Sequence, residues 1–350
     1  MRARFKAAAA TALVATAVAA SAAPAEASPT FKLRVEVPGA TLDPGTYYAV
    51  PRTVLARRGR LSNDSSGICL PSTGRHEIDG PTALGLVAAA AQANRALDPM
   101  LVAEDSFGRR VCRIAGAIER DTPSFSGWLF RNNHVAPPLS SELVPIGSEG
   151  EVLWVFADFG TTFANSGDEL VLTAPVRAQP GAIQVTVQAI TFDGLIAPAP
   201  DGTVVTGGSA VATTTNGVAT VPVAEGEAEL RAVGPGASPT EIPSAPQSVC
   251  VAVDLAQCPE ARGRRIIGTN GKDGLKGTPG PDVIRSRGGR DKVRVSGGGA
   301  DVVNCGKARD VVVADRSDKV KRCNRVLGPA GKGDKDKGGK RRKRGGGGRR

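Results

Sequence analysis

The sequence predicts a mainly β, multi-domain protein that ends in a short parallel β-roll and a disordered basic tail. Three observations lead to this prediction. Aspartates recur at a nearly fixed interval near the C-terminus, β-branched runs separated by turn residues fill the middle, and one helical pattern stands among strand patterns in the first third. The 350 residues suffice for two or three domains, and an aromatic content of only 4% favours small β-rich modules over one large enzyme core.

Residues 1–27 have the pattern of a secretory signal peptide. A basic start precedes an alanine-rich apolar run from Ala7 to about Ala23, and Ala25-Glu26-Ala27 supplies a cleavage site. No second run long enough to span a membrane follows. We therefore expect a secreted, extracellular protein without a transmembrane helix in its mature form, or one held at the cell surface by other means.

Residues 28–160 combine strands with the one clear helix. FKLRVEV (31–37) alternates apolar and polar residues, as a half-buried strand does. A second strand is expected near 47–56, a helix over TALGLVAAAAQANRAL (82–97), and a last strand over GEVLWVFADF (150–159).

Two short motifs in this region carry a family resemblance. Gly127-Trp128-Leu129-Phe130, followed by an asparagine turn, and Gly150 to Phe156 resemble the transcobalamin-C-terminal-like β-grasp domain of bacterial surface proteins. The resemblance implies an α+β β-grasp module, but cobalamin-binding relatives use an additional domain, so no ligand residues are carried over. Trp128 and Trp154 are expected in the core, and His134 is expected to be exposed in a hairpin turn without a catalytic partner.

Residues 166–253 contain many short β-branched runs between Gly, Pro, Asn and Asp turns, which is typical of a β-sandwich. Asn216-Gly217 between alternating runs is the sharpest hairpin signal in the chain. The stretch TTTNGVATVPVAEGEAELRA (213–232) resembles bacterial Ig-like modules, which commonly act as spacers.

Residues 264–325 carry the most informative pattern. Six aspartates follow one another in steps of 9, 9, 10, 9 and 8 residues: Asp273, Asp282, Asp291, Asp301, Asp310 and Asp318. A branched apolar residue stands two positions after each, and a glycine stands two positions before each of the first four. This spacing predicts a coil in which every nonapeptide forms a tight turn and a short strand whose apolar residue points inward.

The nonapeptide G-G-x-G-x-D-x-U-x resembles the hemolysin-type (RTX) calcium-binding repeat. The resemblance implies calcium as the cofactor, with weak affinity of ~10⁻⁴ to 10⁻³ M and the first three units binding best. The implied ligands are carboxylates and turn carbonyls, namely those of Asp273, Asp282, Asp291, Asp301 and Asp310 and of Gly268, Gly271, Gly277, Gly280, Gly289 and Gly299.

A metal-free roll is the alternative. Residues 264–325 contain 16 Lys and Arg against 7 Asp, a net charge of +9, and like charge near a cation site lowers affinity. The later units also lose the inner glycine, which is replaced by Ala308 and Arg316. An apolar column and a disulfide could hold such a roll without metal.

The six cysteines fit an exported protein. Fifteen pairings are formally open, and proximity along the chain favours Cys69–Cys112, Cys250–Cys258 and Cys305–Cys323. Zinc is not expected, because no C-x-x-C or Cys/His cluster occurs and the two histidines, His76 and His134, lie far apart.

Residues 328–350 form a Gly/Lys/Arg tail that we expect to be disordered. Its basic cluster would bind an anionic cell-envelope polymer or phospholipid, or would act only as a solubilising tail: Lys340, Arg341, Arg342, Lys343 and Arg344. Specific nucleic-acid binding is not expected, since no aromatic residue interleaves the basic ones.

No catalytic constellation is found in the sequence. There is no G-x-S-x-G, H-E-x-x-H or nucleotide-binding P-loop, and His76-Glu77 reads as an isolated pair in a loop. We therefore expect a non-enzymatic, secreted or cell-surface multi-domain protein that binds an extracellular protein or glycan and carries a degenerate calcium-binding roll. The alternative is a small-molecule (cofactor-like ligand) binding protein acting through the β-grasp domain, which a concave pocket lined by Trp128 or Trp154 would favour.

Overall fold

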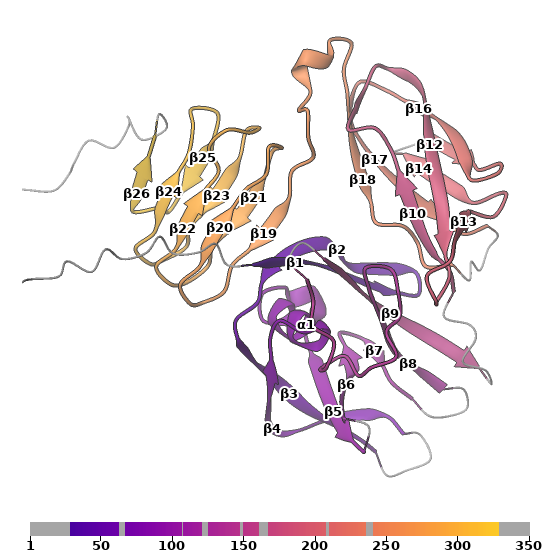
Figure 1. Cartoon of the computed structure of the whole chain (residues 1–350), viewed down its shortest axis with the longest axis vertical. Coiled ribbons are helices and arrows are strands. Elements are labelled where there is room, and N and C mark those ends of the chain that lie inside the picture. The colour runs from indigo at the N-terminus through magenta and orange to yellow at the C-terminus, as the bar shows by residue number, and fades with distance from the viewer. Residues whose placement is uncertain are drawn as a thin grey trace, which may run out of the picture.

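The structure is a computed structural model and describes residues 29–62, 67–106, 108–120, 125–147, 150–160, 167–207, 210–235 and 241–328. The expected signal peptide and the basic cluster at 340–344 lie outside these residues. The described chain is mainly β, with 26 strands and one α-helix, as the sequence predicts. It forms three units: an N-terminal unit, a sandwich and a roll (Figure 1).

The N-terminal unit is built from two sheets with a helix between them. One sheet has the order β2-β1-β9-β8 and the other the order β4-β3-β5-β6-β7. Their bounds are β1 (Thr30–Val37), β2 (Ala40–Ala49), β3 (Thr53–Leu61), β4 (Cys69–Asp79), β5 (Met100–Asp105), β6 (Gly108–Ile114), β7 (Ala117–Ile118), β8 (Phe125–Asn132) and β9 (Glu151–Gly160).

The helix α1 (Ala83–Ala91) is buried along nearly its whole surface, because its residues are apolar all round. Thr82 caps its N-terminus by accepting a hydrogen bond from the Gly85 amide at 3.0 Å. It is shorter than the predicted helix over 82–97, since Asn94 caps a separate 3₁₀ turn, Arg95–Leu97. The single strand predicted near 47–56 was also wrong: β2 ends at Ala49 and β3 begins at Thr53.

The sandwich packs two antiparallel-rich sheets around a core of small apolar side chains. One holds β10 (Glu169–Thr173), β12 (Gly181–Ile190), β13 (Ile196–Pro198) and β16 (Val218–Val223). The other holds β11 (Arg177–Ala178), β14 (Val204–Gly207), β15 (Ala210–Thr213), β17 (Gly226–Val233) and β18 (Gln247–Val251). β12 alternates exposed and buried residues, which is the pattern expected for one face on the core.

The Asn216-Gly217 turn forms, with φ of 50° and 71°, and Thr215 and Val218 close it with two backbone hydrogen bonds. It does not join a hairpin within one sheet. β15 pairs β14, whereas β16 pairs β12 in the opposite sheet. The Asn-Gly dipeptide correctly predicted the turn, but it did not predict which strands pair on either side of it.

The roll is a coil of two parallel sheets, as the spacing predicts. One sheet holds β19 (Arg265–Ile267), β21 (Val283–Arg285), β23 (Val302–Asn304) and β25 (Lys319–Lys321). The other holds β20 (Gly274–Lys276), β22 (Lys292–Arg294), β24 (Val311–Val313) and β26 (Arg325–Leu327). The predicted apolar column is buried between them: Leu275, Ile284, Val293, Val303 and Val312, with Val320 partly buried.

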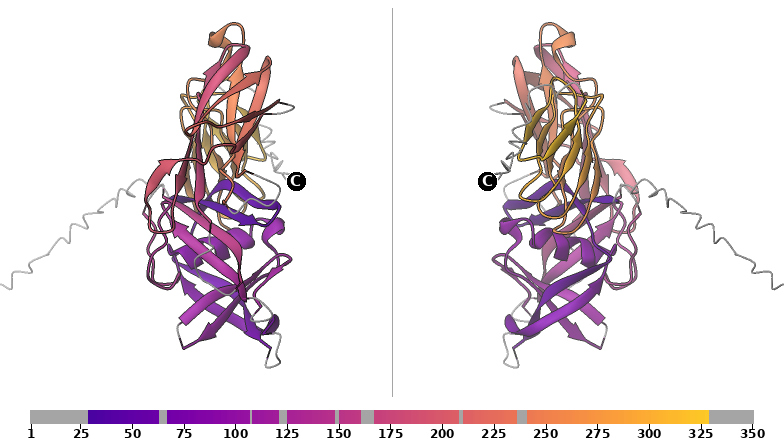
Figure 2. Two further views of the ribbon diagram at one scale, coloured as in Figure 1. Left: turned by 90° about the vertical axis from the view of Figure 1, so that its right-hand side faces the viewer. Right: turned by 90° about the vertical axis from the view of Figure 1, so that its left-hand side faces the viewer.

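The roll continues the first sheet of the N-terminal unit. β19 pairs β2 in parallel, which gives one eight-stranded sheet, β25-β23-β21-β19-β2-β1-β9-β8. Ile266 faces the core of the roll, and Ile267 belongs to the core of the N-terminal unit. In the side views of Figure 2 the roll and the sandwich lie over the same end of the N-terminal unit.

Candidate functional site

The predicted calcium ligands form two ladders inside the roll. All five aspartates are at most 5% exposed: Asp273, Asp282, Asp291, Asp301 and Asp310. In one ladder, the Asp273 amide donates to Asp291 Oδ1 and the Asp291 amide to Asp310 Oδ1, both at 2.9 Å. Each carboxylate therefore ties its own turn to the turn one coil before it.

The second ladder runs along the opposite edge of the roll. The Asp282 amide donates to Asp301 Oδ1 at 2.7 Å, and the Asp301 amide donates to Asp318 Oδ1 at 3.1 Å. A full coil contains two nonapeptides, so alternate aspartates share an edge. This is the pairing expected from the spacing.

The glycines give these carboxylates room. A Cβ on Gly268 would lie 2.8 Å from Asp273 Oδ2, and one on Gly277 would overlap Asp282 Oδ2. The carbonyl of Gly271 lies against the next coil, because a Cβ on Gly289 would overlap it. Of the four inner glycines, only Gly289 has a positive φ, at 97°, so close approach between coils rather than left-handed backbone explains the glycines at Gly280 and Gly299.

Three carboxylates in consecutive nonapeptides, two on one ladder and one on the other, keep one oxygen without a partner. Oδ2 of Asp291, Asp301 and Asp310 is buried and accepts no hydrogen bond from the described residues. Burial, and to a smaller extent neighbouring aspartates, raises the pKa of both Asp291 and Asp301 to about 6, against the effect of the hydrogen bonds that each carboxylate accepts. A buried anionic oxygen without a partner is costly, and a cation or a proton relieves that cost.

No cluster of acidic side chains marks a cation site in the roll. No group of three or more His, Cys, Asp or Glu side chains in the described chain is close enough to share one ion. Each ion would instead meet free Oδ2 atoms from the ladder and backbone carbonyls of the turns, the hard oxygen ligands that calcium takes. Few charged ligands go with weak affinity.

The six cysteines form the three disulfides favoured by the sequence, Cys69–Cys112, Cys250–Cys258 and Cys305–Cys323. Cys69–Cys112 packs in a small core with Leu101 and Ala103. Cys305–Cys323 joins two coils at the far end of the roll, where the inner glycines are lost.

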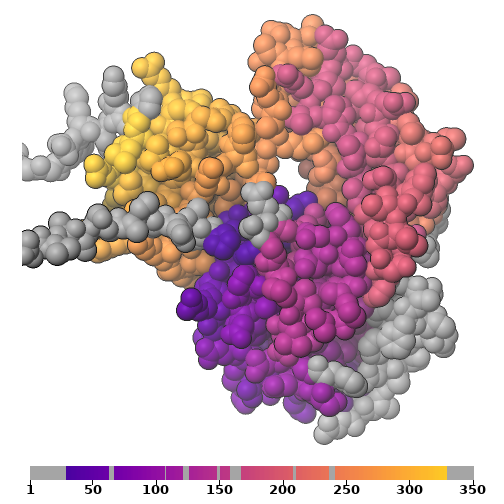
Figure 3. Space-filling model, in the orientation of Figure 1, coloured from indigo at the N-terminus to yellow at the C-terminus, as the bar shows by residue number. Residues whose placement is uncertain are grey.

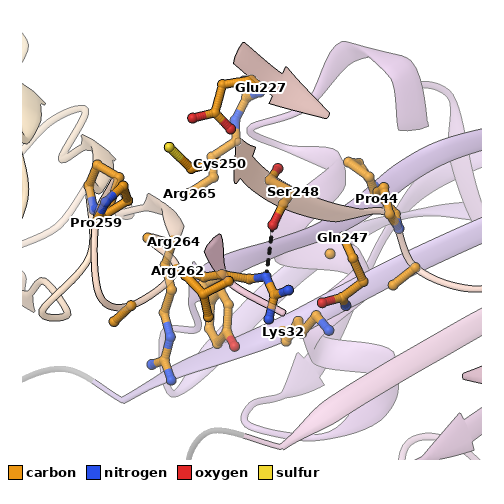
Figure 4. A pocket seen from close by; sticks show the side chains of 18 residues that line it. Lys32, Pro44, Glu227, Gln247, Ser248, Cys250, Pro259, Arg262, Arg264 and Arg265 are labelled. Carbon is orange, nitrogen blue, oxygen red and sulfur yellow. Dashed lines mark hydrogen bonds between the residues drawn. The ribbon is translucent and has the colours of Figure 1, made fainter. Parts of the chain in front are cut away.

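A cleft of about 550 Å³ lies where the three units meet, and Figure 3 shows an opening at this junction. Figure 4 shows Arg262 reaching across it to the Ser248 carbonyl, and the same guanidinium donates to the carbonyls of Ala174 and Pro175 at 2.8 and 2.9 Å. Arg264 stacks 4.4 Å from the centre of the Tyr47 ring. These basic side chains hold the connection between sandwich and roll in place, which is a structural role.

A buried ionic cluster joins the N-terminal unit to the sandwich, and the sequence did not predict it. Arg34 Nη2 lies 2.7 Å from Glu169 Oε1, and both side chains are at most 2% exposed. Arg131 donates to the carbonyls of Ile190 and Gly167 and lies 3.9 Å from Glu169. A second pair, Arg231 with Glu36 at 2.9 Å, links the same two units.

The two histidines differ from their predicted settings. His134 lies in a turn but is half-buried, and its Nδ1 is 3.0 Å from Glu169 Oε1, so it does have an acidic partner. His76 is buried within β4 rather than placed in a loop, with Nδ1 3.5 Å from Glu104. The partner of each histidine is a glutamate, and neither pairs with a serine or cysteine among the described residues.

The tryptophans pack as core residues. Trp154 is 2% exposed and stacks on Phe130 at 5.2 Å, and Trp128 is partly buried with its ring edge-on to Phe156. Neither contributes to the cleft at the junction. Within the described residues, no helix has the length and apolar character needed to cross a bilayer.

No protein-family model and no curated protein sequence matches this chain. One solved structure, the Arg specific cysteine proteinase gingipain R, is similar at 16% sequence identity over 30% of this chain and 23% of that one, with a TM-score of 0.19. This chain therefore covers less than a quarter of that proteinase. A likeness at that level carries neither fold nor activity to this chain.

Proposed function

We propose that this protein is an exported, non-catalytic structural and binding protein whose C-terminal roll is tightened by calcium. The observation that carries the proposal is the free Oδ2 atom of Asp291 and Asp310 on one ladder and of Asp301 on the other. Calcium ions bound along each ladder would satisfy these oxygens and reduce the repulsion between neighbouring aspartates. The three disulfides support an oxidising compartment.

A structural role for the N-terminal unit fits better than small-molecule binding. The tryptophans that would mark a ligand platform pack instead against Phe130 and Phe156. The N-terminal unit contacts the sandwich through the buried ionic cluster and the roll through the shared sheet. We propose that its role is to hold these two units in place.

Calcium titration of the full chain tests the proposal. Thermal melting followed with about 1 to 10 mM calcium, the range of weak extracellular sites, should show a higher Tm than with chelator. Asp291→Asn with Asp301→Asn should abolish the calcium-dependent rise, because each asparagine keeps the acceptor for the neighbouring amide but loses the charge. Asp254→Asn, outside the roll, is the matched control and should keep the full response.

An unchanged Tm in the wild type would leave a metal-free roll held by its apolar column and the Cys305–Cys323 bond. Magnesium at the same concentration should shift the Tm less, since its rigid octahedral shell suits flexible carbonyl ligands poorly. An equal response to both ions would show screening of charge rather than binding.

A further inference from the structure

The roll ends in two strands whose outer edges face no other strand of the described chain. β25 closes one sheet and β26 the other, and both lie at the end of the roll that points away from the N-terminal unit (Figure 1). The Lys319 amide donates to the carbonyl of Asp301 in the preceding coil at 2.7 Å, and the Lys321 carbonyl accepts from that coil as well. Because alternate residues of a strand bond to opposite sides, the N–H and C=O of Val320 point outward. An open edge of this kind can pair with an additional strand.

Every turn on this side of the roll presents the same two backbone groups to the next coil. The Asp282 amide donates to Asp301 Oδ1 at 2.7 Å, and the Asp282 carbonyl accepts from the Val302 amide at 2.8 Å. One coil later, the Asp301 amide donates to Asp318 Oδ1 at 3.1 Å, and its carbonyl accepts from Lys319. Asp318 is the last member of this ladder. Its own amide and carbonyl have no hydrogen-bond partner among the described residues.

This repeat defines the chemistry of a strand that would continue it. An aspartate carboxylate would accept from the Asp318 amide, and the N–H of the following residue would donate to the Asp318 carbonyl, which excludes proline at that position. Two positions after the carboxylate, a branched apolar side chain would cover Val320. That residue is only partly buried, whereas Val303 beneath it is fully buried. The last apolar layer of a stacked repeat needs such a cover.

The charge of the last coil suits an acidic segment. Residues 315–328 contain five Lys or Arg against two Asp, a net charge of +3. Basic side chains occur on both sheets of the roll, so this charge alone does not choose the site; the open backbone groups do. It does favour β25, where two exposed lysines flank Val320, over β26, where only Arg325 is exposed.

Two other occupants of this edge fit poorly. A second copy of this chain cannot stack its roll head to tail on β25, because the first strand of that sheet, β19, already pairs with β2. Two last coils brought together would each carry a charge of +3. Residues 329–350 contain no Val, Ile or Leu and have ten Lys or Arg against two Asp, so they cannot supply the apolar cover.

We propose that the open edge of β25 binds an extended acidic segment of another protein by parallel strand addition. The segment carries an aspartate followed, two positions later, by Val, Ile or Leu, and its carboxylate accepts from the Asp318 amide. It thereby becomes the next strand of the sheet and the next member of the ladder. Calcium is not required for this contact, so the inference goes beyond the proposed function.

A fluorescently labelled peptide tests the proposal on the full chain in chelator. The probe EGTPGPDVIE copies residues 277–284 of the roll between two acidic ends, and its binding is followed by anisotropy. Replacing its aspartate by alanine should weaken binding about tenfold, since a hydrogen bond from an amide to a charged acceptor is lost. Replacing the valine after the aspartate by proline should weaken it by about as much, because the N–H is removed.

A matched pair of variants locates the site on the protein. Val320→Pro removes the outward N–H of β25 and keeps its bonds to the preceding coil, so it should weaken peptide binding at least about tenfold. Val326→Pro makes the same change at the outer edge of β26 and should change affinity less than about twofold. Thermal melting of both variants shows whether the roll remains folded, and the peptide variants test the same contact in the unaltered protein.

A scrambled peptide of the same composition that binds as tightly as the probe would overturn the proposal, because binding would then follow charge alone. Full affinity of the proline-containing peptide, or equal losses in the two folded protein variants, would overturn it as well. Deletion of residues 329–350 should leave the affinity nearly unchanged; a gain of about tenfold would assign the edge to the chain's own tail. A calcium response without peptide binding contradicts only this inference, and the reverse result contradicts only the proposed function.

Discussion

At the scale of single residues, the chain buries charge in two ways. In the ionic cluster, Arg34, Arg131 and Glu169 compensate one another, so each charge has partners. In the roll, backbone amides donate hydrogen bonds to the buried aspartate carboxylates. Three of these carboxylates keep one oxygen without a hydrogen-bond partner. The first arrangement is neutralised by ion pairs within the chain, although Glu169 Oε2 and Arg34 Nε make no hydrogen bond with the described residues. In the second arrangement a proton or a cation can bind the free carboxylate oxygens. The stability of the ionic cluster and that of the aspartate ladders should therefore depend differently on pH.

His134 should stabilise the junction of the first two units in acid. The hydrogen bond to Glu169 raises the pKa of His134, and the charge of Glu151 raises it as well. Burial and the charge of Arg34 lower it, but by less. A raised folded pKa gives stability that is present below the unfolded value of about 6.5 and is lost as pH rises through the folded pKa. His134→Gln should therefore cost more unfolding free energy at about pH 5.5 than at about pH 8.5, as measured by urea denaturation.

His76→Gln provides the control of opposite sign. Burial, and to a smaller extent Arg58, lowers the pKa of His76, so the wild type loses stability as pH falls through about 6.5. Replacing His76 should remove that loss. If the change in unfolding free energy had the same pH dependence in both variants, the placement of His134 in the ionic cluster with Glu169 would be contradicted.

In chelator, Asp291 and Asp301 should make the roll more stable at lower pH. Their pKa of about 6 lies above the unfolded value of about 3.9, so the folded state holds more protons between these values. The stability they contribute is present below about pH 3.9 and is lost as pH rises through about 6. Asp291→Asn with Asp301→Asn should flatten this slope in the Tm measured from about pH 4.5 to about pH 7.5.

Asp315→Asn is the matched comparison, because hydrogen bonds from Ser317 lower the pKa of Asp315. Its contribution is present above the unfolded value and is lost in acid, so its removal should leave the slope through pH 6 intact. A wild-type Tm that rises steadily with pH over this window would show that the two ladder carboxylates remain ionised.

At the scale of elements, the roll could be predicted and the ionic cluster could not. The roll is a local repeat in which every nonapeptide carries its own turn, buried acid and apolar residue, so spacing alone gives the coil and the ladders. Arg34, Arg131 and Glu169 sit in strands far apart in the sequence, and each reads there as an exposed polar position. The limit also shows at Asn216-Gly217, where the turn was correct but its flanking strands belong to opposite sheets.

Substitution of two glycines in the roll distinguishes the cost of backbone strain from the cost of steric overlap. Gly289 and Gly297 both have positive φ, at 97° and 87°, but a Cβ on Gly289 would overlap the Gly271 carbonyl, whereas one on Gly297 meets open space. Gly297→Ala should cost about 1 kcal/mol for the backbone alone. Gly289→Ala should cost clearly more in the same denaturation experiment, and equal costs would contradict the close stacking of coils.

At the scale of the whole molecule, the N-terminal unit holds the other two by different means. The sandwich is attached through buried charge and a small apolar cluster of Leu153, Val155 and Ile242. The roll is attached through backbone, as β19 extends the sheet at β2. The pairing of a three-residue strand with a distant edge carries no sequence signal, which is why the shared sheet could not be predicted.

Ile267 is the side chain through which roll and N-terminal unit should lose stability together. It is 5% exposed, lies opposite Tyr48 on β2 and packs in the N-terminal core, while its neighbour Ile266 packs in the roll. Ile267→Ala should cost about 2 to 5 kcal/mol, the range for emptying a buried isoleucine site. Because β19 lies between β2 and β21, hydrogen exchange should accelerate in both neighbours.

Ile284→Ala is the matched control, since Ile284 is fully buried on β21 and belongs to the roll core alone. It should accelerate exchange in β21 and β23 and leave β2 nearly unchanged. Unaltered exchange in β2 with Ile267→Ala would mean that the eight strands do not unfold as one sheet. Coupled exchange would link the roll directly to the N-terminal unit, so that an ion which stabilises the coil would also protect the edge strand β2 from exchange.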